Sequence, residues 1–217
     1  MNKILFPGWG IPKEEYAALK SDIVIDYGFF SNENTAPDLM NPDEWLNSIK
    51  PPKPYIIIAH SMGTIFALCN SSLRDNAEAV IIAGGFAKFI QSDDNPYGKP
   101  LVEPAMMQKQ LRRNPALLLK SFYRAAAAPE QLKIQVPQTF NIKQLHAGLE
   151  LLKKCDIRSN LISIDIPVTI LHGKNDSIVS VKLAEYMQQN IRNSSLEIIE
   201  NTGHALPLTS PQKIDCK

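Results

Sequence analysis

The run Tyr-Ile-Ile-Ile-Ala at residues 55–59 contains no charged side chain, which is typical of a strand that is covered on both faces. Two longer stretches, 61–74 and 181–190, carry apolar residues at helical spacing. Because strands alternate with helices, the sequence predicts an α/β fold with a mostly parallel, doubly wound sheet. The other candidate strands are Lys3–Phe6, Ile23–Tyr27, Ala79–Ala83, Val168–His172 and Leu196–Glu200.

The stretch 86–160 interrupts this alternation, because helix-forming residues dominate it and no convincing strand is found there. The predicted helices within it are Pro104–Arg113, Pro115–Ala128 and Asn141–Cys155. We therefore predict a core formed by residues 1–85 and 161–217, with a helical cap inserted at 86–160.

Charge is distributed unevenly between these two parts. The whole chain has a net charge of +1, which gives no general reason to expect nucleic acid or an anionic membrane as a partner. Residues 88–160 hold twelve Lys and Arg against six Asp and Glu, so this stretch carries +6 and the remainder −5. Two interpretations stay open: solvated helix surfaces, or a basic surface that attracts an acidic partner or substrate.

Several classes of protein lack support in the sequence. Cys69, Cys155 and Cys216 are too few and too widely spaced for a disulfide framework or a cysteine metal site, which favours a reducing compartment. No apolar run approaches the roughly 18 residues of a membrane span, and the N-terminus lacks the apolar segment of a signal peptide. No common nucleotide or zinc motif occurs. We expect a cytoplasmic monomer without a cofactor or metal.

The segment Ala59-His60-Ser61-Met62-Gly63 nearly matches the G-x-S-x-G nucleophile elbow, with alanine in place of the first glycine. A serine in a tight strand-to-helix turn projects its hydroxyl above the sheet, and small neighbours prevent collisions. The helix N-terminus also directs backbone N–H groups toward the reacting centre. We predict that Ser61 is a nucleophile; the alternative is a serine that only caps the helix.

A nucleophilic serine needs a base. His204 lies in a loop just past the last predicted strand, where parallel-sheet proteins place their catalytic groups. The other histidines fit less well. His60 adjoins the serine too closely, His146 is in the middle of a predicted helix, and His172 ends a strand as a core residue would. We predict that His204 is the base.

The base needs an acid that orients it, and Asp176 follows the strand Val168–His172 directly. It should therefore leave the sheet at the same edge as Ser61 and His204. The chain order Ser, Asp, His is that of α/β-hydrolases. We predict these three residues as a catalytic triad; the alternative for Asp176 is a turn residue or a helix cap.

Acyl transfer also requires an oxyanion hole. The backbone N–H of Met62, directly after the nucleophile, is one expected donor. The segment Pro7-Gly8-Trp9-Gly10 follows the first strand, and its glycines allow backbone to approach a substrate closely. We expect Trp9 to supply the second N–H; the alternative is an ordinary turn with a packing tryptophan.

With these residues in place, the chain resembles the α/β-hydrolases, and more narrowly the pimeloyl-[acyl-carrier protein] methyl ester esterases of biotin synthesis. The resemblance rests on the segments Pro7–Gly10, Ala59–Gly63 and Gly203–Ala205, and most particularly on Gly148–Arg158, which is similar to the family's return from cap to core. Family members usually begin with a strand pair before the oxyanion loop. This chain starts directly on the strand before that loop, so we expect reduced N-terminal strands.

The resemblance implies an esterase that removes the methyl ester from a pimeloyl chain on acyl carrier protein, an acidic partner that would suit the basic cap. It implies a substrate pocket formed by Trp9, Ser61, Met62 and a cap segment corresponding to Phe122, Tyr123, Arg124, Ala125 and Ala126. Arg112, Arg113 and Arg124 are candidates to contact the carrier's phosphate or its acidic helix. The alternatives are an esterase or thioesterase with another acyl substrate, a lyase of menaquinone synthesis, and a non-enzymatic binding scaffold.

Overall fold

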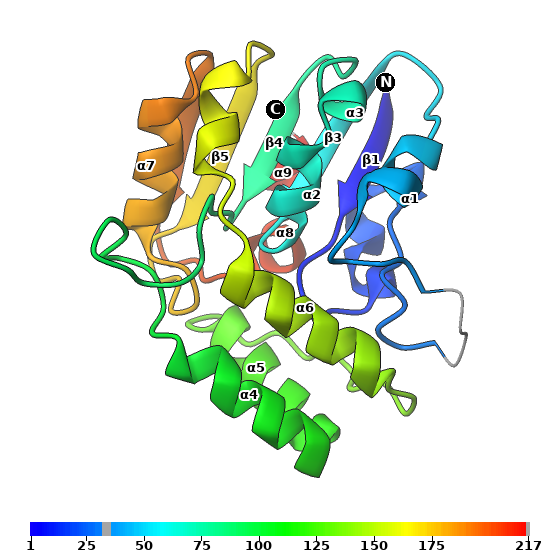
Figure 1. Cartoon of the computed structure of the whole chain (residues 1–217), viewed down its shortest axis with the longest axis vertical. Coiled ribbons are helices and arrows are strands. Elements are labelled where there is room, and N and C mark those ends of the chain that lie inside the picture. The colour runs from blue at the N-terminus through cyan, green and yellow to red at the C-terminus, as the bar shows by residue number, and fades with distance from the viewer. Residues whose placement is uncertain (32–35, 216–217) are drawn as a thin grey trace.

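The computed structural model describes residues 1–31 and 36–215, in which six parallel strands form one sheet in the order β2-β1-β3-β4-β5-β6 (Figure 1). The strands are β1 (Asn2–Phe6), β2 (Ile23–Val24), β3 (Tyr55–His60), β4 (Val80–Ala83), β5 (Val168–Gly173) and β6 (Ser194–Ile199). A strand occurs at each predicted place, and the predicted α/β class with a parallel sheet is confirmed. Cys216 lies outside the described residues.

Strand β3 is in the interior of the sheet, and all six of its residues are buried. Ile57 pairs with Ile4 on β1 and with Val80 on β4, so apolar side chains lie side by side across the centre. The strand order changes direction between β1 and β3, because the chain adds β2 on one side of β1 and then crosses to the other. Loops that leave the carboxyl ends of such a strand pair diverge and form a crevice.

The helix expected over residues 61–74 is divided in two, which corrects the prediction. It consists of α2 (Gly63–Cys69) and α3 (Ser71–Arg74), and Asn70 between them has an extended backbone, with φ −87° and ψ 98°. The Asn70 side chain accepts a hydrogen bond of 2.8 Å from the N–H of Leu73 and so caps α3. Asparagine favours such caps because its side chain competes with the helical backbone for hydrogen bonds.

Strand β2 is shorter than predicted, since the sequence suggested that it continues to Tyr27. After Val24 the Asp26 carboxylate accepts the N–H of Gly28 at 2.8 Å, and Gly28 has a φ of +73°. A left-handed glycine and a local carboxylate bond are typical of a turn, so the chain leaves the sheet here.

Further helices surround the sheet. The 3-10 helix η1 (Lys13–Leu19) packs against two short helices near the C-terminus, α8 (Leu206–Thr209) and α9 (Gln212–Asp215). No pattern in the sequence predicted these three helices or α1 (Asp43–Ser48). In contrast, α7 (Val181–Asn190) has the predicted bounds and packs against β5 and β6.

Between β4 and β5 the chain forms α4 (Val102–Arg113), α5 (Pro115–Ala127), α6 (Ile142–Lys154) and the 3-10 helix η2 (Arg158–Ser163). Figure 1 shows α4, α5 and α6 together beyond the carboxyl ends of the strands. An asparagine directly precedes each of α5 and α6, Asn114 and Asn141 respectively, and its side chain accepts a backbone N–H from the first turn of the helix. We propose that residues 86–160 form the cap of this fold, and call this segment the proposed cap.

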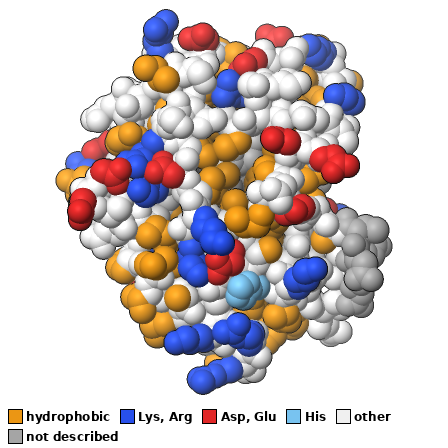
Figure 2. All heavy atoms as spheres, viewed as in Figure 1, with side chains coloured by type: hydrophobic (Ala, Val, Ile, Leu, Met, Phe, Trp, Pro, Cys, Tyr) orange, Lys and Arg blue, Asp and Glu red, His pale blue; other side chains and the backbone are white. Residues whose placement is uncertain are grey.

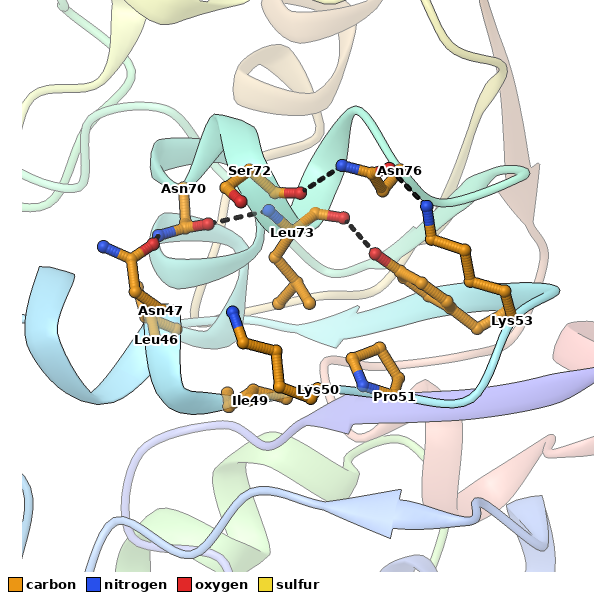
Figure 3. Close-up of a pocket in the computed structure, with 11 residues that line it drawn as sticks. Leu46, Asn47, Ile49, Lys50, Pro51, Lys53, Asn70, Ser72, Leu73 and Asn76 are labelled. Carbon is orange, nitrogen blue, oxygen red and sulfur yellow. Dashed lines mark hydrogen bonds between the residues drawn. The ribbon is translucent and has the colours of Figure 1, made fainter.

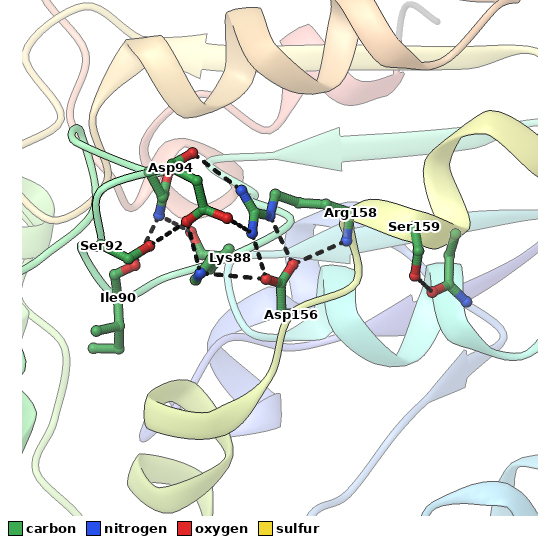
Figure 4. Close-up of polar contacts among 9 residues, drawn as sticks. Lys88, Ile90, Ser92, Asp94, Asp156, Arg158 and Ser159 are labelled. Carbon is green, nitrogen blue, oxygen red and sulfur yellow. Dashed lines mark hydrogen bonds and ion pairs between the residues drawn. The ribbon is translucent and has the colours of Figure 1, made fainter.

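An ion-pair cluster joins the two ends of the proposed cap (Figure 4). Arg158 binds Asp94 and Asp156 at 2.7 Å each, and Lys88 lies 3.1 Å from Asp94 and 3.3 Å from Asp156. Networks of several charges are more stabilising than isolated surface pairs. The N–H of Ile157 also donates to the carbonyl of Ala87, so entry and exit segments are held side by side.

Candidate active site

Ser61 is in a strained turn between β3 and α2. Its φ is 52°, in the left-handed region that costs a non-glycine residue free energy, and its N–H donates to the carbonyl of Ala83 at 3.0 Å. Gly63 lies so close to the carbonyl of Phe6 that a Cβ there would be 2.1 Å from the oxygen. This contact is the physical reason for the small residue two positions after the serine.

Asp176 and His204 form a hydrogen bond at the same edge of the sheet. His204 Nδ1 lies 2.7 Å from Asp176 Oδ2, and both side chains are only 1% exposed. The second carboxylate oxygen accepts the N–H groups of Ile178 and Val179 at 2.8 Å each. Burial raises the pKa of Asp176, but the His204 and His172 rings and the Val179 N–H outweigh burial and hold the pKa below its ordinary value.

The carboxylate is therefore ionised and accepts the Nδ1–H of His204, which leaves Nε2 as the basic nitrogen. This Nε2 atom is buried and has no hydrogen-bond partner among residues 1–31 and 36–215. The His204 ring lies near Ser61, since its centroid is 5.1 Å from that of His60, the residue directly before the serine. The structure thus brings all three candidate triad residues to one edge, without a bond from Ser61 to Nε2.

Gly84, directly after β4, is a residue of this site that sequence reasoning missed. A Cβ there would lie 3.1 Å from His204 Nδ1 and 3.4 Å from Asp176 Oδ2, and its φ is +56°. The pair Gly84-Gly85 at the carboxyl end of a buried strand is the sequence signal that could have identified Gly84 as part of the site.

A cavity opens from Ser61 between the sheet and the proposed cap. Trp9 and Phe122 line it with their rings in an edge-to-face contact, 5.3 Å between centroids. The Trp9 indole N–H donates to the carbonyl of Leu145 at 2.9 Å, which ties the loop after β1 to α6. Most of the lining is apolar. The remaining lining residues were not predicted from the sequence; they are Phe89, Glu103, Pro104, Met107, Leu149, Leu152 and Ile178.

The other candidate pocket residues lie around this cavity rather than among its lining residues. Tyr123 donates from its hydroxyl to the carbonyl of Gly10 at 2.7 Å. The carbonyl of Ala125 accepts the hydroxyl of Ser177 at 3.3 Å, and that of Ala126 accepts the N–H of Ala205 at 2.8 Å. Met62 is fully buried at the start of α2. These bonds hold α5 against the loops that carry the candidate triad.

The three candidate arginines are exposed on the proposed cap. Arg112 and Arg113 are in the last turn of α4, and Arg113 lines a surface groove with Met106, Lys109 and Leu117. Figure 2 shows Lys and Arg side chains gathered at the end of the molecule that α4 and α5 form. Arg124 lines a separate groove with Lys120 and Lys133.

Another pocket lies at the opposite end of β3, beside Tyr55 (Figure 3). Tyr55 begins the strand and Ser61 follows its last residue, which separates the two by about 20 Å at the usual rise per residue. Polar side chains that line this pocket form hydrogen bonds with one another: Asn70 donates to Asn47, and Lys53 donates to Asn76. This pocket is separate from the candidate active site.

Two buried histidines near the site should make stability depend on pH. His172 is a fully buried core residue whose Nε2 lies 3.0 Å from the carbonyl of Val179, while its Nδ1 has no hydrogen-bond partner among the described residues. Burial lowers the pKa of both, that of His60 from 6.5 to about 3. Between pH 6.5 and about pH 3, His60 is protonated in the unfolded chain and neutral in the folded chain. The free energy of unfolding therefore falls as pH falls through this range.

From pH 7 to pH 5 we expect the free energy of unfolding to drop by about 2 kcal/mol from His60 alone. Urea unfolding at both pH values measures this drop. A His60→Gln variant should lose that share of the pH dependence, whereas His146→Gln, at a half-buried position on α6, should keep it. An equal pH dependence in the wild type and in His60→Gln would contradict the assignment.

Within the described residues, no helix is long and apolar enough to cross a membrane, and no group of three or more His, Cys, Asp or Glu side chains is placed to hold a metal ion.

Comparisons with known proteins agree with this geometry. The model of the "Alpha/beta hydrolase family" matches residues 4–214. A pimeloyl-[acyl-carrier protein] methyl ester esterase of Pseudoalteromonas atlantica is 26% identical, over 94% of this chain and 87% of that protein. The protein of the same name from Nitrosomonas europaea is 36% identical over 69 residues, which are 32% of this chain and 27% of that one.

Among solved structures, an esterase from Exiguobacterium antarcticum superposes with a TM-score of 0.81 at 21% identity, over 99% of this chain and 88% of that chain. At that level of identity the likeness shows the fold. The family match extends from β1 to α9 and includes every residue of the candidate site. The chain therefore belongs to the alpha/beta hydrolase family.

Proposed function

We propose that this protein is a serine carboxylesterase that hydrolyses the methyl ester of pimeloyl-acyl carrier protein, a step in biotin biosynthesis. The observation that carries the proposal is the 2.7 Å bond between Asp176 and His204 at the sheet edge where Ser61 occupies its strained turn. The names of the relatives supply the substrate. The coarser activity, hydrolysis of carboxylic esters, is supported by the family and by relatives named as esterases.

In the proposed mechanism, His204 Nε2 takes the proton of Ser61 as its oxygen attacks the ester carbonyl. Asp176 holds the ring in the tautomer that leaves Nε2 free and stabilises the imidazolium that forms. Ser61 and Nε2 are not bonded here, and catalytic hydrogen bonds often tighten only when substrate binds. The N–H groups of Met62 and Trp9 hold the oxyanion, methanol leaves, and water activated by His204 releases the carboxylate.

The cavity suits the acyl part of such a substrate. Apolar rings and aliphatic side chains from the core and the proposed cap surround the space beside Ser61. A chain of methylenes gains roughly 0.8 kcal/mol for each CH2 that it buries there. Phe122 on α5, together with residues of α4 and α6, would meet the chain.

The basic surface of the proposed cap would meet the acidic carrier. The groove beside Arg113 places the exposed apolar side chains of Met106 and Leu117 among cations, a pattern that fits an acidic helix with an apolar face. Arg124, with Lys120 and Lys133, offers a second cationic groove for a phosphate. Such surfaces increase the rate at which oppositely charged partners meet.

Charge reversal tests this docking. The variant Arg112→Glu/Arg113→Glu/Arg124→Glu should lower kcat/KM for the carrier-bound ester about 10- to 100-fold more than for a small aryl ester. The control Arg192→Glu, an exposed arginine of the core, should affect both substrates equally. Equal losses on the two substrates in the triple variant would refute carrier docking on this surface.

The substrate itself is tested by methanol release from pimeloyl-carrier methyl ester, measured beside free methyl esters, aryl esters and acyl thioesters. A clear preference for the carrier-bound methyl ester supports the proposal. Faster turnover of thioesters or of other esters would indicate the alternative esterase or thioesterase. Activity only on a menaquinone precursor would indicate the lyase.

A non-enzymatic scaffold is the remaining alternative, and an active-site serine probe that fails to label Ser61 would favour it. We further propose that the enzyme acts in the cytoplasm as a monomer. The free thiols of Cys69 and Cys155 agree with a reducing compartment.

A further inference from the structure

A buried polar chain lies beneath the candidate active site and is not part of the triad. The hydroxyl of Tyr16, on η1, lies 2.6 Å from Nδ1 of His60 and accepts the N–H of Gly8 at 2.9 Å. On the other side of the ring, Nε2 of His60 lies 2.9 Å from the backbone carbonyl of His204. Tyr16 is 1% exposed and His60 is fully buried.

The positions of the protons follow from these partners. A carbonyl oxygen can only accept, so the hydrogen of the His60 ring is on Nε2. Burial lowers the pKa of His60 to about 3, so the ring is neutral and its Nδ1 carries no hydrogen. The Tyr16 hydroxyl must then donate to Nδ1, while its oxygen accepts from Gly8. The chain runs from Gly8 N–H to Tyr16, from Tyr16 O–H to His60, and from His60 Nε2–H to His204.

This chain joins the three loops on which the proposed reaction depends. Gly8 directly precedes Trp9, the expected oxyanion donor; His60 directly precedes Ser61; and the last acceptor belongs to His204 itself. The fit is close, because a Cβ on Gly8 would lie 2.9 Å from His60 Nδ1. A shift in any one of these loops would therefore break one of the hydrogen bonds that run from Gly8 through Tyr16 and His60 to His204.

We propose that Tyr16 is a positioning residue of the Ser61 centre: by donating to Nδ1 of His60 and accepting the N–H of Gly8, its hydroxyl keeps the oxyanion loop, the nucleophile and the base in register. The proposal rests on the proposed function, since it concerns the same reaction. Without the hydroxyl, Nδ1 of His60 and the N–H of Gly8 both lose this partner, while the His204 carbonyl still holds the ring hydrogen on Nε2. The loop that carries Trp9 is then no longer tied through Tyr16 to the turn that carries Ser61.

The variant Tyr16→Phe removes one oxygen atom and keeps the ring. We expect kcat for an aryl ester to fall about 10-fold or more while KM changes less than about twofold, because the reacting groups are displaced and the cavity is not. A kcat within twofold of the wild type would overturn the proposal.

Two other buried tyrosines supply matched controls. The hydroxyl of Tyr27 is buried without a partner in the described part of the chain, so Tyr27→Phe removes a hydroxyl that makes no bond. The Tyr55 hydroxyl donates to the carbonyl of Leu73 at 2.7 Å, far from the site, so Tyr55→Phe loses one buried bond. Both variants should keep kcat within about twofold. A loss in Tyr55→Phe equal to that in Tyr16→Phe would mean that general destabilisation causes the effect, and would refute positioning.

The tautomer can be measured without any assay of activity. In a sample with 15N-labelled histidine, NMR should show hydrogen on Nε2 of His60 in the wild type, and the resonance of the bare Nδ1 should move in Tyr16→Phe, where this nitrogen loses its donor. Hydrogen on Nδ1 in the wild type would overturn the proposal even if Tyr16→Phe fails to fold. Aryl ester turnover that survives Ser61→Ala would instead overturn the proposed function, and the NMR result would still show whether Tyr16 donates to Nδ1 of His60.

Discussion

Replacement of Ser61 by alanine should lower kcat for an aryl ester by about 10⁴-fold or more, because the only atom removed is the proposed nucleophile. Binding of the substrate should change little, since Trp9, Phe122 and the aliphatic residues of the cavity remain. The fold should also persist. Alanine meets the same backbone strain at φ 52° that serine already tolerates, and the side chain is only 7% exposed.

The measurement is steady-state kinetics with an aryl ester, together with urea unfolding to show that the free energy of unfolding changes by less than about 1 kcal/mol. Ser71→Ala, at an exposed position on α3, is the matched control and should retain wild-type kcat. Turnover by Ser61→Ala within tenfold of the wild type would remove Ser61 from the mechanism. A covalent serine probe should label the wild type and fail to label the variant.

The strands and the elbow were predictable because each has a local cause. A strand without polar residues, such as 55–59, must be buried on both faces of the sheet, and all six residues of β3 are buried. Since parallel strands end at one edge, Asp176 and His204 could be predicted to meet although they are 28 residues apart. The break at Asn70 was missed because the apolar stripe continues across it and hides the capping signal.

The cavity and the chain of buried hydrogen bonds through Tyr16 and His60 were not predictable, because neither has a local cause in the sequence. Leu149 and Leu152 are on an apolar stripe of α6, and a stripe that faces a cavity has the same periodicity as one that faces the core. His60 was excluded as a base because it adjoins Ser61, and that reasoning could not reveal a bond to Tyr16, 44 residues away. Such pairings depend on the three-dimensional path of η1, which leaves no periodic pattern in the sequence.

Asp176→Asn should lower kcat about 10⁴-fold while the fold is retained, and the reason lies in the direction of its hydrogen bonds. One carboxylate oxygen accepts the N–H groups of Ile178 and Val179, so the amide oxygen of asparagine will keep that position. The amide NH2 then faces Nδ1 of His204 and donates to it. Nδ1 becomes an acceptor, the ring hydrogen moves to Nε2, and the nitrogen that should receive the Ser61 proton is already occupied.

The control Asp165→Asn removes the same charge from an exposed position before β5 and should keep kcat within about twofold. Kinetics with an aryl ester measures both variants, and 15N NMR of His204 should show hydrogen on Nδ1 in the wild type and on Nε2 in Asp176→Asn. The two readouts must change together, because one moved proton causes both. If kcat collapses while the hydrogen stays on Nδ1, Asp176 acts by its charge alone; if kcat survives, another group orients the base and the proposed triad is wrong.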